Sequence, residues 1–98
     1  MNLLGENRIY QITKKLPNRI HIAAYVGDLK AVQHELDQGV DVDIETKSGY
    51  SIRALHWAAS RGFIEVVKLL VERKANVDTQ NANGSTPLMM AAEEGNII

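Results

Sequence analysis

Three stretches of this chain are nearly the same. They read IHIAAYVG at residues 20–27, LHWAASRG at residues 55–62 and LMMAAEEG at residues 88–95, so their first residues are 35 and 33 positions apart. Two extra residues lie between Tyr50 and Ala54 and account for the longer spacing, which leaves an underlying period of 33 residues. A fixed period of this length is typical of stacked repeat units, each of which buries its apolar face against its neighbours.

Each repeat predicts a pair of helices followed by an arm. The paired alanines let neighbouring first helices approach closely, and the glycine that closes each stretch suits the left-handed end of a helix. Asp28 and Asn96 follow directly and are suitable N-caps for a second helix, whose apolar residues within 64–71 have helical spacing. Residues 40–44 alternate apolar and polar, which predicts an extended arm, and Asn83-Gly84 predicts a tight turn.

Two segments carry a family resemblance. Residues 84–92 read GSTPLMMAA and residues 66–70 read VVKLL, and both are similar to the consensus of the ankyrin repeat. The resemblance covers residues 18–98 and implies protein–protein recognition, because members of that family are overwhelmingly binding modules or regulatory domains. The first repeat departs from the consensus with Asn18-Arg19 in place of Thr-Pro, and Lys74 stands where the family has glycine.

The expected architecture is an all-α repeat (solenoid) of stacked ankyrin-type helix-turn-helix units with short β-turn arms. We assign the units to residues 18–50, 51–83 and, as a partial repeat, 84–98. Residues 1–17 do not match the repeat, but Ile9, Ile12 and Leu16 have helical spacing and Pro17 is a suitable stop. This segment is predicted to be a capping helix that covers the exposed end of the first repeat.

The composition argues against several classes of function. The 11 Lys+Arg and 12 Asp+Glu residues give a formal net charge of −1 without a long run of one sign, so no electrostatic footprint for nucleic acid or an anionic membrane is present. The absence of cysteine removes disulfides and thiolate metal sites. Because the sequence contains neither an apolar run of about 20 residues nor a secretory signal, we expect an intracellular, cytoplasmic chain without membrane insertion.

Histidine is the first candidate for catalysis, because it titrates near neutrality and binds metals. His21 and His56 occupy the same repeat position, which places their imidazoles in a row along the stack and not around one centre. The ankyrin resemblance assigns this histidine to hydrogen bonding at the turn that opens the first helix. His34 is isolated on a helix face and is expected to be solvated. We therefore predict no catalytic residue, and a chain that is not an enzyme.

The carboxylates of one arm offer a candidate metal site. Asp41, Asp43 and Glu45 alternate along the predicted extended segment and would share one face, as ligands of a calcium or magnesium ion do. The ligand number and glycine-containing loop of a known motif are absent, so hydrogen bonds of the arm and turn are the favoured interpretation. Glu93 and Glu94 are adjacent and are interpreted as a solvated pair. The sequence predicts neither a metal ion nor a cofactor.

The predicted binding surface combines the row of first helices, which lines the concave face in the ankyrin family, with the arm tips. From the row we predict Ile22, Tyr25, Val26, Trp57, Ser60, Arg61, Met90, Glu93 and Glu94, and from the tips Lys47, Ser48, Tyr50, Asn81, Ala82, Asn83 and Ser85. The row changes from apolar, through Arg61, to acidic. Trp57 has two open interpretations, an interface anchor or packing on Ile22 and Met90.

These features predict a non-catalytic module that binds another protein, whose identity the sequence does not reveal. The alternative is a regulatory segment of a larger enzyme or channel that acts in cis. Residues 96–98 stand where the second helix of the third unit should begin, so residues 88–92 are expected to be uncovered. An uncovered apolar patch marks an interface or an aggregation liability. We therefore predict either self-association through this end or fraying from Glu93 onward.

Two local expectations concern departures from the repeat. Lys74 ends the second helix of the second unit, and we predict that it has a left-handed backbone, in which a non-glycine residue is disfavoured. Ser51 is the predicted N-cap of the helix that follows the insertion. The two inserted residues should lengthen the arm or the helix locally, so deletion of Ile52 and Arg53 is expected to be tolerated.

Overall fold

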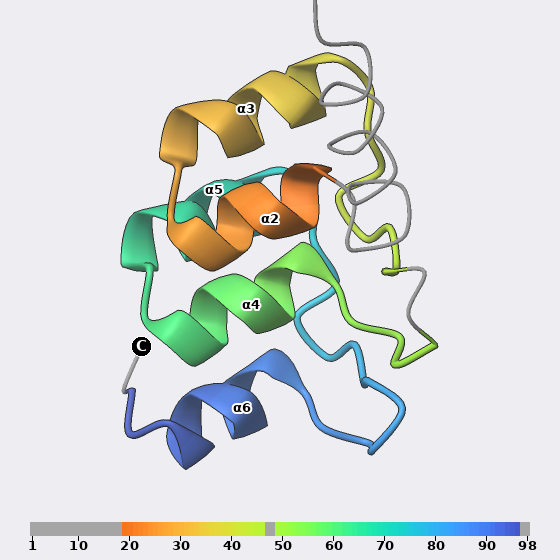
Figure 1. Cartoon of the computed structure of the whole chain (residues 1–98), viewed down its shortest axis with the longest axis vertical. Coiled ribbons are helices and arrows are strands. Elements are labelled where there is room, and N and C mark those ends of the chain that lie inside the picture. The colour runs from red at the N-terminus through yellow and green to blue at the C-terminus, as the bar shows by residue number, and fades with distance from the viewer. Residues whose placement is uncertain (1–18, 47–48, 97–98) are drawn as a thin grey trace, which may run out of the picture.

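The structure, a computed structural model, describes residues 19–46 and 49–96. Within them the chain folds into helices without a strand: α2 (Arg19–Val26), α3 (Leu29–Asp37), α4 (Ala54–Arg61), α5 (Ile64–Glu72) and α6 (Pro87–Glu93). The first helices α2, α4 and α6 stack in one row, α3 and α5 form a second row, and the arms lie beside one end of the first helices (Figure 1). The predicted all-α repeat architecture is confirmed.

Several expectations fall on residues that lie outside this description. They are the capping helix within residues 1–17 and the arm-tip residues Lys47 and Ser48. Among the described residues, no helix is long and apolar enough to cross a membrane.

Close packing of the first helices depends on their alanines. Ala24, Ala58 and Ala91 have no exposed surface, and α4 packs against both α2 and α6. A methyl side chain lets two helix backbones approach, which a larger residue would prevent. Val32 on α3 and Leu70 on α5 are also fully buried and belong to the core that joins the two rows. Each helix pair therefore buries its apolar face against the next pair.

The same turn ends each first helix. Its hydrogen bonds join Asp28 N–H to Ala23 O at 2.9 Å, Phe63 N–H to Ala58 O at 2.9 Å, and Asn96 N–H to Ala91 O at 2.8 Å. The glycine just before each donor has a positive φ of 76 to 80°, which only glycine adopts without strain. Asp28 then caps α3 by accepting a hydrogen bond from the Ala31 N–H, as predicted. The backbone at Asn96 thus follows the course that leads into α3 and α5.

The first arm contains a turn where the sequence pattern predicted an extended segment. The Ile44 N–H donates to Asp41 O at 3.1 Å, and Asp41 Oδ1 accepts from the Asp43 N–H at 2.9 Å. The extended-arm prediction was wrong because aspartate side chains bond their own backbone two residues on, which favours a turn over a strand. The tight turn predicted at the other tip is confirmed, since the Gly84 N–H donates to Asn81 O at 2.9 Å.

The insertion lengthens the arm and leaves the helix unchanged in length. The helix α4 begins at Ala54 with Arg53 as its N-cap residue, so the prediction of Ser51 as N-cap was wrong. Ser51 instead has a φ of 54° and its carbonyl accepts a hydrogen bond from the Arg53 guanidinium. Ile52 O accepts from the Thr46 N–H at 2.8 Å. Because both inserted residues make such bonds, the structure argues against tolerance of their deletion.

Lys74 has the left-handed backbone that its repeat position predicted, with a φ of 73°. The Ala75 N–H donates to Leu70 O at 2.9 Å, which closes the end of α5 as a glycine would. Lys74→Gly is expected to raise the free energy of unfolding by about 0.5–1 kcal/mol, because relief of the strain outweighs the added freedom of the unfolded chain. Chemical denaturation of both proteins measures this change. A midpoint that stays the same or falls would contradict it.

Candidate protein-interaction surface

The predicted row residues occupy one strip of the stack. The helix α2 contributes Ile22, Tyr25 and Val26, α4 contributes Trp57, Ser60 and Arg61, and α6 contributes Met90 and Glu93, with Glu94 just beyond its end. All nine are exposed or half-buried, whereas the alanines and histidines between them on α2 and α4, and Ala91 on α6, are buried. This separation follows from the helical period, which places buried residues on the face toward the neighbouring helices and exposed residues on the opposite face.

Three of these residues contact one another across two repeats. The rings of Tyr25 and Trp57 meet edge-on, with centroids 5.1 Å apart and an interplanar angle of 87°. The guanidinium carbon of Arg61 lies 4.3 Å from the Tyr25 centroid and 5.6 Å from that of Phe63. Edge-to-face rings and a guanidinium over an aromatic face are both favourable arrangements. We call Tyr25, Trp57 and Arg61 the aromatic–arginine cluster.

Two hollows flank this cluster. One, of about 350 Å³, is lined by His21, Ile22, Tyr25 and Trp57 and is almost entirely apolar. The other, of about 440 Å³, is lined by Tyr25, Trp57, Ser60, Arg61, Glu94 and Asn96 and is largely polar. The cluster therefore separates a place for an apolar side chain from a place for polar groups, which is a common composition of recognition sites.

Of the two interpretations of Trp57 that the sequence left open, packing beside Ile22 has structural support, and the interface anchor stays a prediction. It packs against the buried core and shares the apolar hollow with Ile22, yet its side chain remains half-buried and lines both hollows. The contact with Tyr25 was not foreseen. Its Nε1–H is buried without a hydrogen-bond acceptor among the described residues. An unsatisfied donor of this kind costs about 1–3 kcal/mol and is relieved when an acceptor arrives.

The arm tips hold both structural and available groups. Asn81 Oδ1 accepts from the N–H groups of Asn83 and Ser85, and the Ser85 carbonyl accepts from the Asn81 N–H, so these residues form the turn itself. Tyr50 is 61% exposed, and its carbonyl accepts from the Ala82 N–H at 2.8 Å, which joins the two arms. The phenol of Tyr50 is thus a large, exposed side chain in the described part of these tips.

The histidines connect each first helix to its arm. His56 Nδ1 accepts from the Arg53 N–H at 3.1 Å, so its Nε2 carries the proton and donates to Ser85 O at 3.0 Å. His21 Nε2 lies 2.7 Å from Ile44 O. Burial holds the pKa of both imidazoles below 6.5, although hydrogen bonds to backbone carbonyls oppose that shift. The predicted structural role at the opening of the first helix is confirmed for His56, and His34 is exposed.

The arm carboxylates each bond to the protein. Asp43 Oδ1 accepts from the Asn76 N–H of the next repeat at 2.9 Å, and Glu45 pairs with Arg53 at 2.6 Å. The Arg53 guanidinium also donates to Gln80 O, so it links both arms. These cross-repeat contacts were missed by the sequence analysis. Within residues 19–46 and 49–96, no three His, Asp or Glu side chains are grouped to hold a metal ion.

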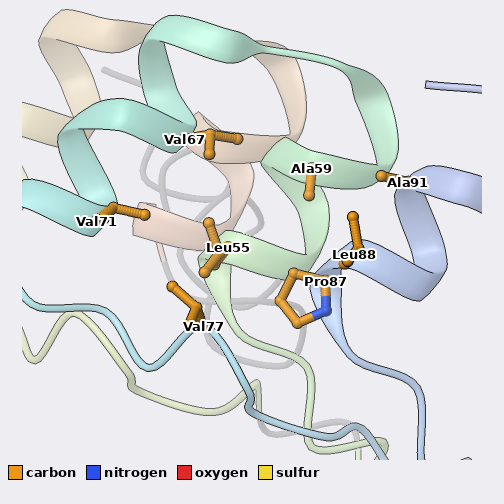
Figure 2. A pocket seen from close by; sticks show the side chains of 8 residues that line it. All are labelled: Leu55, Ala59, Val67, Val71, Val77, Pro87, Leu88 and Ala91. Carbon is orange, nitrogen blue, oxygen red and sulfur yellow. The ribbon is translucent and has the colours of Figure 1, made fainter. Parts of the chain in front are cut away.

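An apolar groove lies at the end of the stack formed by the third unit. It encloses about 130 Å³ and is lined by Leu55, Ala59, Val67, Val71, Val77, Pro87, Leu88 and Ala91, none of which is charged. Side chains from α4, α5, α6 and the arm after α5 surround this hollow (Figure 2). Leu88 is 68% exposed and Met89 51%, as predicted for residues 88–92. The prediction was wrong for Ala91, which is fully buried because it packs inside the stack.

Helix pairs stacked in two rows, with an exposed strip along the first row, define this protein as a helical repeat of the solenoid class. A family model described as ankyrin repeats, in three copies, matches residues 20–98. The chain therefore belongs to the ankyrin repeat family, whose repeat domains are non-catalytic protein-interaction modules.

The relatives are mostly much longer than this chain. It is 38% identical over 82 residues to serine/threonine-protein kinase 12 of Arabidopsis thaliana, which covers 81% of this chain and 17% of the kinase. It is 34% identical over 77 residues to the E3 ubiquitin-protein ligase XBAT32 of the same plant, covering 79% and 15%. A putative ankyrin repeat protein of Rickettsia bellii is 28% identical over 102 residues, covering 98% and 61%. This chain thus spans less than two thirds of each.

Proposed function

We propose that this chain is a protein-binding module and not an enzyme, and that it recognises a partner through the first-helix row and the exposed Tyr50. The observation that carries the proposal is the aromatic–arginine cluster, because it places exposed aromatic and guanidinium groups between two hollows. Tyr, Trp and Arg are the residue types that most often contribute large binding energies at interfaces. The buried alanines beneath fix the helices that carry them.

Affinity capture with paired variants tests this function. Trp57→Ala with Arg61→Ala removes the cluster. Lys68→Gln with Arg73→Gln alters charges on α5 and at its C-cap and is the matched control. A partner retained by the wild type and the control, but lost by the cluster variant, is purified and its affinity measured by calorimetry. Retention of every bound protein by the cluster variant contradicts recognition of a separate partner through this surface.

The groove supports a second candidate function, self-association of two copies. A two-fold pair would bring two copies of the same uncharged lining together, so burial of apolar surface meets no charge repulsion there. Leu88→Glu places a charge on the groove and is expected to leave a monomer where the wild type forms dimers. Since Leu88 is 68% exposed, the substitution should cost less than about 0.5 kcal/mol of stability.

Light scattering over a concentration series measures this self-association. Val26→Glu is the control, because Val26 is 58% exposed and does not line the groove. We expect the wild type and Val26→Glu to dimerise with similar concentration dependence. A wild type that stays monomeric throughout, or dimers that persist in Leu88→Glu, would rule out this use of the groove.

The comparisons support action in cis within a larger protein. The matched segment is 17% of the kinase and 15% of the ubiquitin ligase. In that setting the row would bind another segment of the same polypeptide. We propose a cytoplasmic location for either arrangement. The cluster variants distinguish binding of a separate protein from binding in cis. Loss of a captured protein indicates a separate partner, whereas a cis contact is lost without loss of a captured protein.

A further inference from the structure

The guanidinium of Arg61 is held in place but not neutralised. Its carbon lies over the Tyr25 ring at 4.3 Å and near the Phe63 ring at 5.6 Å, so one face is used by an aromatic contact. Within the described residues it forms no ion pair, unlike Arg53 and Arg73, whose guanidinium groups each contact a carboxylate at 2.6 Å. Stacking leaves the in-plane N–H donors free, and these are the donors that pair with a carboxylate.

The side chains around Arg61 indicate which second group a ligand would carry beside a carboxylate. Trp57 and Tyr25 separate the polar hollow beside Arg61 from the apolar hollow beside Ile22. The Tyr25 ring centroid lies 5.1 Å from the Trp57 ring centroid and 4.3 Å from the Arg61 guanidinium carbon. Side chains two positions apart on an extended segment are about 7 Å apart, so one short segment can reach both hollows.

We propose that the cluster binds an extended peptide segment of a partner protein, in which an apolar or aromatic side chain stands two positions from a carboxylate. The apolar side chain enters the hollow of Ile22, Tyr25 and Trp57, and the carboxylate pairs with Arg61. This inference rests on the proposed protein-binding function and adds the chemistry of the partner. Because the rings already hold Arg61, pairing costs little further side-chain entropy.

The charge around the cluster favours a single carboxylate over a polyanion. Glu94 lines the same hollow as Arg61, and Glu93 precedes it. A nucleic acid or an anionic membrane would bring several negative charges against these two glutamates, whereas a peptide places one charge at one point. Glu94 should therefore weaken an acidic ligand modestly, and its removal should strengthen binding.

The single tryptophan of the chain allows a direct test, because Trp57 fluorescence reports from the site itself. The probes are short blocked peptides without tryptophan that carry Phe two positions before Glu. Matched peptides carry Gln for Glu, or Ala for Phe. We expect saturable binding of the Phe–Glu peptide and about tenfold weaker binding of each matched peptide, the size that a charge-assisted hydrogen bond or a buried ring contributes. Calorimetry provides the second readout.

Variants of the chain assign the selectivity to Arg61. Arg61→Gln should bind the Glu and Gln peptides equally and Arg61→Lys should keep only part of the preference, because lysine lacks the planar fork. Arg73→Gln is the arginine control and should behave as wild type. Glu94→Gln should bind the Phe–Glu peptide about two- to fivefold more tightly at low salt. Circular dichroism checks that each variant is folded.

Several results would overturn the proposal. They are equal affinity of the wild type for the Glu and Gln peptides, a carboxylate preference that survives Arg61→Gln, or no binding of any peptide by fluorescence and calorimetry. None of these touches the proposed function, which is judged by whether the cluster variant loses a captured partner. If the cluster variant loses that partner but the wild type binds the Glu and Gln peptides equally, the surface binds proteins through a different chemistry.

Discussion

Gly27→Ala is expected to lower the free energy of unfolding by about 2–4 kcal/mol, a large share of the stability of a small domain. Gly27 has a φ of 80°, where an alanine costs about 1–2 kcal/mol. A Cβ at this position would also lie 2.8 Å from Cε1 of the Phe63 ring, and overpacking of this kind costs about 1–3 kcal/mol. Chemical denaturation of the purified variant measures the loss.

A second glycine separates the two contributions. Gly39 has a φ of 94°, but apart from its own residue and its two chain neighbours no atom lies within 4 Å of a Cβ built there. Gly39→Ala therefore carries the backbone cost alone, about 1 kcal/mol after the unfolded state is counted. Phe63→Leu in the Gly27→Ala background should recover part of the difference. Equal losses at Gly27 and Gly39 would show that the ring moves aside without cost.

The pairing of Gly27 with Phe63 also shows what the sequence pattern could not predict. Phe63 stands at the repeat position of Asp28 and Asn96, where a polar N-cap is expected, and it makes no capping hydrogen bond. Instead its ring packs on Gly27 of the preceding repeat and lies beside Arg61. The one sequence feature that pointed to a special role of Phe63 was an aromatic residue at a capping position. Its contacts depend on side-chain directions between repeats, which periodicity does not specify.

Features that recur in every unit were predictable for a physical reason. The paired alanines, the helix-ending glycines and the left-handed Lys74 each follow from one local requirement repeated at a fixed period. The candidate surface was predictable to the same extent, as exposed positions of the first helices. The aromatic–arginine cluster was not predictable. Tyr25 and Arg61 lie 36 residues apart, and their contact depends on how two repeats stack and on the side-chain rotamers.

Local side-chain hydrogen bonds account for the errors in the arms. Alternation of apolar and polar residues predicted an extended segment, but Asp41 accepts a hydrogen bond from the backbone N–H two residues later. At the insertion, the favoured capping type of Ser51 suggested the start of a helix. The helix begins after Arg53 instead. The Arg53 N–H donates to His56 Nδ1, and its guanidinium contacts Ser51 O, Gln80 O and Glu45.

His56→Ala is expected to lower the free energy of unfolding by about 2–4 kcal/mol, because it removes two hydrogen bonds and leaves a cavity where a fully buried imidazole stood. The Arg53 N–H loses its acceptor, and the Ser85 carbonyl loses its donor. His34→Ala, which removes an exposed imidazole, should change stability by less than about 0.5 kcal/mol and is the matched control.

Dependence on pH distinguishes this role from simple packing. Burial lowers the pKa of His21 and His56 in the folded chain below the value of 6.5, so between the folded pKa and 6.5 the unfolded state binds more protons. Protonation would also remove the acceptor of the Arg53 N–H and place a second cation near that guanidinium. Stability should therefore be fully present above about pH 6.5 and fall as the pH falls below it. Denaturation midpoints measured across this range should fall less steeply in His56→Ala than in the wild type, and identical slopes would mean that His56 is not held neutral by the fold.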